Sequence, residues 1–151
     1  MNTIKINLML IALFLVLVGC QEKELSETAA FAKEYLELQG YNVLTYEGQL
    51  ESYKITKYKV DSIPYHIHWS LPGNNPEPYY NKIVEVEKFI VNNHPLDNWE
   101  CCDGVKSKGK VSTYVYVVEG QIVGGYSTPY GIKPSAGVVG GNWSLDGKSK
   151  E

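Results

Sequence analysis

The first nineteen residues restrict the folded part of this chain more than any other feature. Lys5 precedes an uninterrupted apolar run over residues 8–18. A positively charged start, a short apolar segment and a small residue before a cleavage point are typical of a secretory signal peptide. The run has 11 residues, far fewer than the roughly 20 that a membrane-spanning helix needs. We therefore predict that residues 1–19 are a signal peptide, that residues 20–25 are a tether, and that residues 26–151 form one globular domain.

The residues around the end of this segment, Leu17-Val18-Gly19-Cys20, resemble the lipobox of bacterial lipoproteins. The resemblance implies that the Cys20 sulfur receives a diacylglyceryl group and that cleavage makes Cys20 the first residue. Two acyl chains such as palmitate give a stable membrane anchor, whereas one gives a marginal anchor. Gln21 rather than aspartate follows, so both a Gram-positive and a Gram-negative envelope stay open. We expect a lipid-anchored protein on the extracytoplasmic face of the cell membrane; the alternative is a plain cleaved signal peptide.

Composition disfavours a nucleic-acid partner. Residues 20–151 contain 13 lysines, no arginine and 17 acidic residues, which gives a net charge of −4. The guanidinium group of arginine is the preferred group for bidentate phosphate capture, and nucleic-acid-binding domains are usually basic. The 12 tyrosines instead suit half-buried strands and contact surfaces.

One amphipathic helix is predicted near the start of the domain. Ser26 is a suitable N-cap, Glu27 complements the helix dipole, and Gly40 is a natural stop. The helix should span residues 27–39 and place apolar residues on the inner face at helical spacing: Phe31, Ala32, Tyr35, Leu36 and Leu38.

The remaining pattern predicts strands, which gives an α+β fold with the N-terminal helix packed on an antiparallel sheet of about five or six strands. Glu119-Gly120 between two β-branched runs indicates a hairpin. Thr56 is the expected cap of a helical turn over residues 56–62. Residues 82–91 also fit a helix, but their β-branched excess favours a strand. The candidate strands are residues 41–46, 51–55, 65–70, 82–91, 111–118, 121–127 and a short final one at 142–145.

Three segments carry a resemblance that covers most of the domain, from about Tyr35 to Lys148. They are residues 86–97 (VEKFIVNNHPLD), 117–127 (VVEGQIVGGYS) and 140–148 (GGNWSLDGK). They resemble a family of small, uncharacterised bacterial lipoproteins and secreted proteins. The resemblance implies a small domain at a bacterial cell surface and brings no activity and no catalytic residues.

His66 and His68 are the candidate metal ligands. They lie two apart on the predicted strand 65–70, where side chains at i and i+2 share a face about 6.6 Å apart. Both rings would then reach one zinc ion at about 2.1 Å. Further ligands would come from His94, Cys101, Cys102 and Asp103. Neither a HExxH motif nor paired CxxC motifs support the metal, so two solvent-exposed histidines and no cofactor are the alternative.

Cys101 and Cys102 are the candidate redox pair. Neighbouring Cα atoms are about 3.8 Å apart, whereas an unstrained disulfide needs roughly 4.4 Å or more. A disulfide between them would be strained and easily reduced. The flanking acids Glu100 and Asp103 would raise the thiol pKa values and so lower reactivity. A redox switch and a pair of reduced cysteines both stay open.

No motif nominates an enzyme. The chain lacks GxGxxG, GxxxxGK[ST] and GxSxG patterns, and Glu85 and Glu87 are expected on a solvated strand face. We expect a binding or regulatory module at the cell surface, with a protein of the envelope as a possible partner. The alternative is a metal-binding protein or hydrolase that uses His66 and His68.

Overall fold

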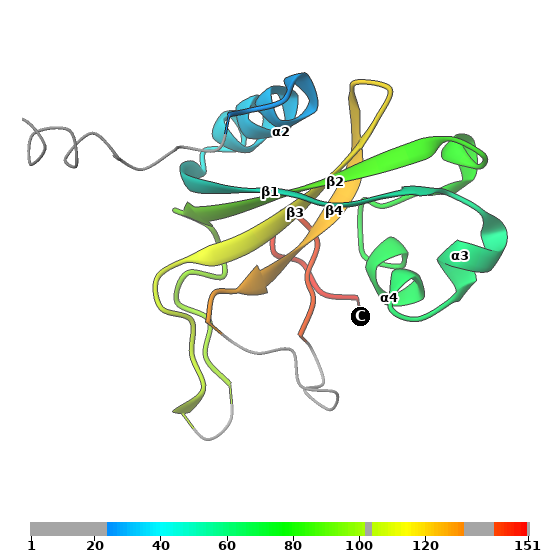
Figure 1. Ribbon diagram of the computed structural model, residues 1–151. Coiled ribbons are helices and arrows are strands. Elements are labelled where there is room, and N and C mark those ends of the chain that lie inside the picture. The colour runs from blue at the N-terminus through cyan, green and yellow to red at the C-terminus, as the bar shows by residue number, and fades with distance from the viewer. Residues whose placement is uncertain (1–23, 102–103, 132–140, 151) are drawn as a thin grey trace, which may run out of the picture.

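Four antiparallel strands form the sheet in the described part of this protein (Figure 1). The computed structural model describes residues 24–101, 104–131 and 141–150, so the α+β class is confirmed for these residues. The strands follow the chain order across the sheet: β1 (Asn42–Lys54), β2 (Ile83–Asn92), β3 (Val111–Val118) and β4 (Gln121–Pro129).

Helix α2 (Glu27–Leu38) packs on the first face of this sheet. The Ser26 side chain accepts a hydrogen bond from the Ala29 backbone N–H at 3.0 Å, which caps the first turn. The residues that contact the sheet are small ones and one leucine: Ala29, Ala32 and Leu36. The prediction that Phe31 and Leu38 lie on the inner face of this helix is wrong, because their side chains are 45% and 77% exposed. Alanines at the contact let the helix approach the strands more closely than large side chains would.

Three short helices follow β1, and residues from this region pack on the second face of the sheet. They are α3 (Lys57–Asp61), α4 (Tyr65–Trp69) and the 3-10 helix η2 (Glu77–Tyr79). Trp69 is the main buried side chain of α4, and its ring lies 4.8 Å from that of Tyr116 on β3. Figure 1 shows α3 and α4 grouped beside one end of the sheet, on the opposite side from α2.

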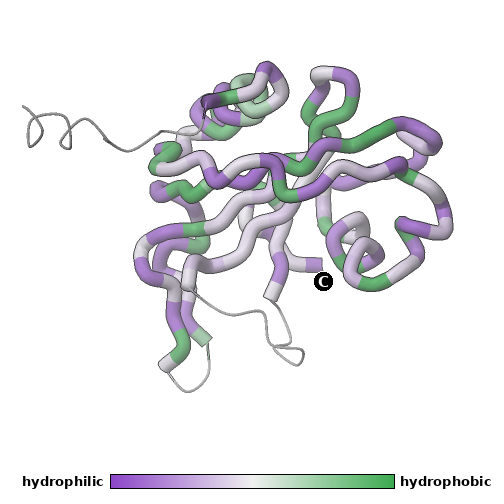
Figure 2. The backbone as a smooth tube through the Cα atoms, in the orientation of Figure 1, coloured by the Kyte–Doolittle hydropathy of each residue, from purple (hydrophilic) through white to green (hydrophobic). Residues whose placement is uncertain are grey.

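Each face of the sheet has its own core because side chains alternate along a strand. On β3, Val115 and Val117 belong to the cluster under α2, whereas Tyr116 and Val118 belong to the cluster under α4. Figure 2 shows hydrophobic positions distributed along the strands and the short helices rather than gathered in one element.

The sheet has fewer strands than expected because two predicted strands are one. β1 runs through both 41–46 and 51–55, and the predicted turn at Glu47-Gly48 lies inside it. Gly48 still pairs with Lys88 of β2, and the register shifts on either side of this pair. The extra residues are therefore accommodated as bulges instead of a turn.

The predicted strand 65–70 is also wrong, because these residues form α4. The Ser70 N–H donates to the His66 carbonyl at 3.1 Å, which is a helical contact. Trp69 is the buried side chain of this helix, so the residues bury one aromatic ring and not every second side chain as a strand would. At 142–145 only Trp143 pairs, in an isolated bridge with Ser127.

Other predictions are confirmed. Thr56 caps α3 through its side chain, β2 spans nearly all of 82–91, and Glu119-Gly120 joins β3 to β4. Within the described residues, none of the helices has the length and apolar character needed to cross a membrane.

Candidate ligand-binding site

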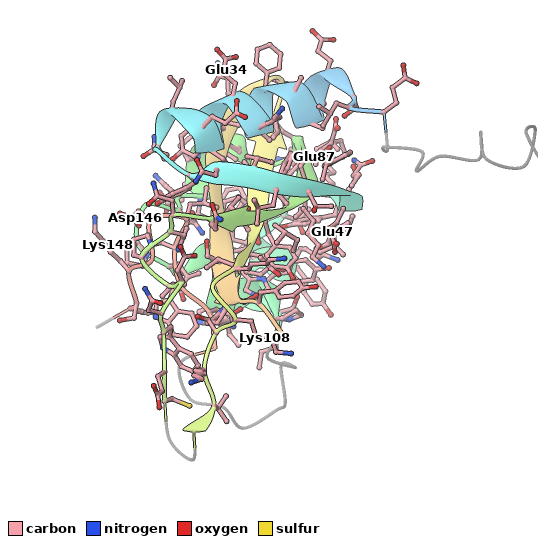
Figure 3. The ribbon with its side chains drawn as sticks, turned by 90° about the vertical axis from the view of Figure 1, so that its left-hand side faces the viewer. Glu34, Glu47, Glu87, Lys108, Asp146 and Lys148 are labelled. Atoms are coloured by element: carbon pink, nitrogen blue, oxygen red, sulfur yellow. The ribbon has the colours of Figure 1, made fainter. Side chains whose placement is uncertain are left out.

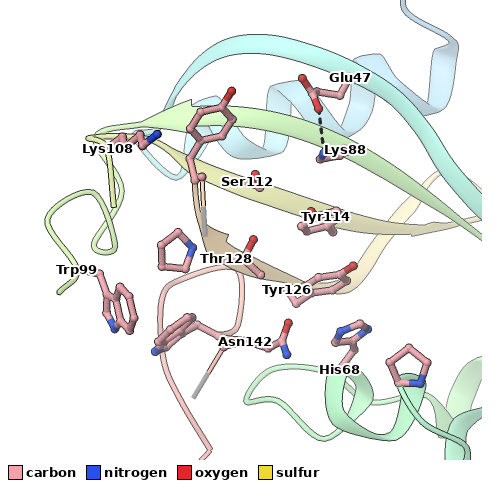
Figure 4. Close-up of a pocket in the computed structure, with 16 residues that line it drawn as sticks. Glu47, His68, Lys88, Trp99, Lys108, Ser112, Tyr114, Tyr126, Thr128 and Asn142 are labelled. Carbon is pink, nitrogen blue, oxygen red and sulfur yellow. Dashed lines mark hydrogen bonds and ion pairs between the residues drawn. The ribbon is translucent and has the colours of Figure 1, made fainter. Parts of the chain in front are cut away.

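A row of side chains crosses the second face of the sheet where α4 stops covering it. Lys88 on β2 lies opposite Tyr114 on β3, and Tyr114 lies opposite Tyr126 on β4. Directly opposite residues of antiparallel strands bring their side chains into contact. The row ends on β1, where Glu47 accepts a hydrogen bond from the Lys88 ammonium at 2.8 Å (Figure 4).

The aromatic members of this row are stacked. The Tyr114 and Tyr126 rings are 4.2 Å apart and nearly parallel, and the His68 ring of α4 lies 3.8 Å from the other face of Tyr126. On the far side, the Lys88 ammonium lies 5.7 Å from the centre of the Tyr114 ring. Because both faces of Tyr126 are covered, it contributes its ring edge to the surroundings. Aromatic edges carry partial positive charge and favour oxygen atoms.

A second row carries hydroxyl groups instead of apolar side chains. Ser112 on β3 lies directly opposite Thr128 on β4. Ser112 is buried and Thr128 is half-buried. These two rows line a pocket of about 840 Å³, a size typical of sites for small organic ligands. The remaining lining residues are Pro64, Trp99, Lys108, Pro129, Tyr130, Gly131, Gly141, Asn142 and Trp143.

Among the described lining residues, Lys88 and Glu47 form an ion pair, and Lys108 is a second lysine. Burial lowers the pKa of His68 to about 4, although a hydrogen bond with Asn142 opposes this shift. His68 is therefore uncharged at pH 7. Burial raises the pKa of Tyr126, so that its phenol stays protonated. The hydrogen bond that the Lys88 ammonium donates to Glu47 raises the pKa of Lys88, so that this ammonium stays charged.

Asn74 fixes α4 to the sheet and so fixes the stack. Its amide group donates to the carbonyls of His68 and Gly125, at 2.7 and 2.9 Å. Its side-chain oxygen accepts from the Gly125 N–H at 2.9 Å. Gly124 and Gly125 are necessary for this approach: a Cβ at Gly124 would lie 2.2 Å from the Asn74 oxygen, and both residues have φ near +150°. No sequence motif predicts these contacts of Asn74.

The geometry predicted for His66 and His68 is wrong. On a helix, residues two apart are rotated by about 200° and point to different sides. His66 is exposed, whereas His68 lies in the stack. His94 uses both ring nitrogens internally: it accepts from the Leu96 N–H at 3.1 Å and donates to the Leu145 carbonyl at 2.9 Å. Over the residues described, no three or more histidine, cysteine or acidic side chains are arranged to hold a metal ion.

The cysteine predictions fall mostly outside the described residues. Cys101 is half-buried, and its N–H donates to the Val105 carbonyl at 2.9 Å. Cys102 and Asp103 lie outside the described residues, as does the predicted lipidation site Cys20. The redox pair and the lipid anchor therefore stay predictions.

The prediction that Glu87 lies on a solvated strand face is wrong. Glu87 is 1% exposed and lies between α2 and the sheet (Figure 3). The Tyr46 hydroxyl donates to it at 2.7 Å. Burial and this contact raise the pKa of Tyr46 to about 12. Figure 3 also shows Lys108, which lines the pocket, farther from α2 than Glu87 is. Glu87 itself does not line the pocket.

No protein-family model matches this chain, and searches of the curated proteins and of the solved structures find no match either.

Proposed function

We propose that this protein is a lipid-anchored binding domain on the extracytoplasmic face of a bacterial membrane. Its ligand would be a small organic molecule held on the part of the second sheet face that α4 does not cover. The pocket of about 840 Å³ is the observation that carries the proposal.

Preorganisation supports a binding role for this pocket. The stack of His68, Tyr126 and Tyr114 is built from three elements, and Asn74 fixes the helix that supplies His68. A wall that is already ordered loses little conformational entropy when a ligand binds. The buried hydroxyl of Ser112 adds a directional group in a largely apolar site, as expected for a pocket that orients its ligand.

Chain length supports the anchored placement. Five residues, 21–25, separate Cys20 from Ser26, which caps α2. Even fully extended they reach only about 20 Å. An acylated Cys20 would therefore hold the pocket close to the membrane surface, where tethering raises the effective concentration of the domain for other surface molecules.

Metabolic labelling with an alkyne analogue of palmitate tests the anchor. The intact protein should incorporate the label and partition into the detergent phase. Cys20→Ser should do neither, and the matched control Cys101→Ser should behave as the parent does. Label that persists in Cys20→Ser, or an unlabelled parent that starts at Met1, would contradict the anchor.

A fragment screen by amide NMR tests the pocket. Uncharged fragments should shift the resonances of Ser112, Tyr126 and Asn142. Thr128→Tyr should fill the site and abolish these shifts, whereas Thr45→Tyr makes the same change at an exposed position on β1. Fragments that bind equally well to Thr128→Tyr, or a screen without hits in the pocket, would refute the binding role.

A further inference from the structure

We propose that the pocket takes an uncharged oligosaccharide. The inference rests on the proposed function and specifies its ligand class. It follows from three properties of the described lining: an ion pair that already joins Lys88 to Glu47, uncharged hydrogen-bonding groups on the floor, and aromatic walls.

The balance of charge argues against an anionic or cationic ligand. Lys88 is 26% exposed at its side chain and already donates to Glu47 at 2.8 Å. A charged ligand would have to separate this pair, because neither member presents an uncompensated charge to the pocket. His68 is neutral at physiological pH. Of the lining residues that the structure describes, Lys108 is the other charged one, and its side chain is exposed.

The floor argues against a purely apolar ligand. The hydroxyls of Ser112 and Thr128 face each other on neighbouring strands, and the Asn142 amide lies beside His68 (Figure 4). An apolar molecule over these groups would remove their water without replacing its hydrogen bonds, which is costly. A ligand with several hydroxyl groups would both donate to them and accept from them.

The walls provide apolar contact for the C–H surfaces of sugar rings. Trp99 and Trp143 meet edge to face at 5.3 Å, and both line the pocket. In Figure 4, Thr128 of the hydroxyl row lies between Trp99 and Tyr126. Sugars combine apolar ring faces with hydroxyl rims, so one molecule satisfies the walls and the floor together.

Tryptophan fluorescence and amide NMR provide the test. Cellotetraose and the tetramer of β-1,4-linked N-acetylglucosamine are the probes, titrated to about 10 mM because millimolar affinity is the weakest range of interest. At least one of them should quench the emission and shift Ser112 and Asn142. Thr128→Val should weaken binding about fivefold through loss of one hydroxyl. Thr45→Val carries the same change on β1 and should bind as the parent does.

Replacement of Lys108, an exposed residue that lines the pocket, distinguishes an anionic ligand from an uncharged one. Lys108→Ala should leave the affinity for the neutral sugar within about twofold. If a galacturonate tetramer binds more tightly than both neutral sugars and Lys108→Ala weakens it, the ligand is anionic and the proposal is overturned.

Failure of the ligand class is distinguishable from failure of the pocket. Fragments that shift the pocket resonances without binding of either neutral sugar would overturn the oligosaccharide and leave the binding role intact. Absence of both responses would overturn both. Equal affinity of Thr128→Val and the parent would place the sugar elsewhere on the protein and would also overturn the proposal.

Discussion

Replacing Asn74 with alanine should unfold the protein at a markedly lower temperature, although Asn74 is not part of the core. Its amide group makes three hydrogen bonds, two to Gly125 and one to His68, all between 2.7 and 2.9 Å. Alanine removes all three at once. The N–H and C=O groups of Gly125 then lose the hydrogen bonds that the Asn74 side chain made with them.

The loss can be estimated from these contacts. A hydrogen bond within a protein contributes about 1 kcal/mol net, so these three part-buried ones contribute about 3 kcal/mol. A domain of this size loses about 4 °C of melting temperature per kcal/mol, which predicts a decrease of about 12 °C. Asn74→Asp should be as damaging, because it turns a donor toward two carbonyl oxygens into an acceptor.

Thermal and denaturant unfolding followed by circular dichroism are suitable assays. Asn98→Ala is the matched control because Asn98 is exposed, and it should change the melting temperature by less than about 2 °C. A second measurement follows the His68 ring by NMR. Its pKa should rise from about 4 toward about 6.5 in Asn74→Ala, because α4 separates from Tyr126 and exposes the ring.

The role assigned to Asn74 is refuted if Asn74→Ala and Asn98→Ala have the same melting temperature. It is also refuted if Asn74→Ala is destabilised while the His68 ring keeps its low pKa, because the amide would then not be what holds α4 against the sheet.

Three further results are expected. Tyr46→Phe should lower the free energy of unfolding in urea by about 2 kcal/mol, because the buried Glu87 loses a hydrogen-bond donor; an unchanged midpoint would disprove this. Gly125→Ala should cost more than about 3 kcal/mol and reduce soluble yield, because the new Cβ would lie 2.2 Å from the Tyr114 carbonyl oxygen. Acidification should destabilise the fold: the His68 pKa is lowered to about 4, so its contribution is complete above pH 6.5 and is lost as the pH falls toward 4. Allowing for its partial exposure, the loss is about 2 kcal/mol, and His68→Gln should show a flatter pH profile in the same urea titration.

Much of the local structure is encoded in short patterns. The Ser26 cap, the Thr56 cap and the Glu119-Gly120 turn each depend on residues within a few positions, and each is predicted from sequence. The inner face of α2 was misassigned because Phe31 and Leu38 are apolar and correctly spaced. Only the sheet, through its close approach to Ala32, determines which side of the helix is buried.

The site depends on register, which no local pattern supplies. A two-residue turn at Glu119-Gly120 alone would place Tyr114 opposite Gly125. The register shift between Tyr116 and Val117 moves Tyr126 into that position. His68 then joins from another element through the contacts of Asn74. The pattern of Tyr65, Ile67 and Trp69 predicted a strand because alternation over a few residues does not distinguish a strand from a short helix that buries one side chain.

The interruptions in the pairing of β1 have a consequence for crowding. Along its ladder with β2, β1 changes register three times within thirteen residues. A strand that bends this often does not present a straight series of N–H and C=O groups to a newcomer. On the proposed lipid anchor, copies would share one membrane and meet repeatedly in two dimensions, with exposed Leu44 and Leu50 on this strand. We expect this irregular border to hinder such copies from pairing along β1 into fibres.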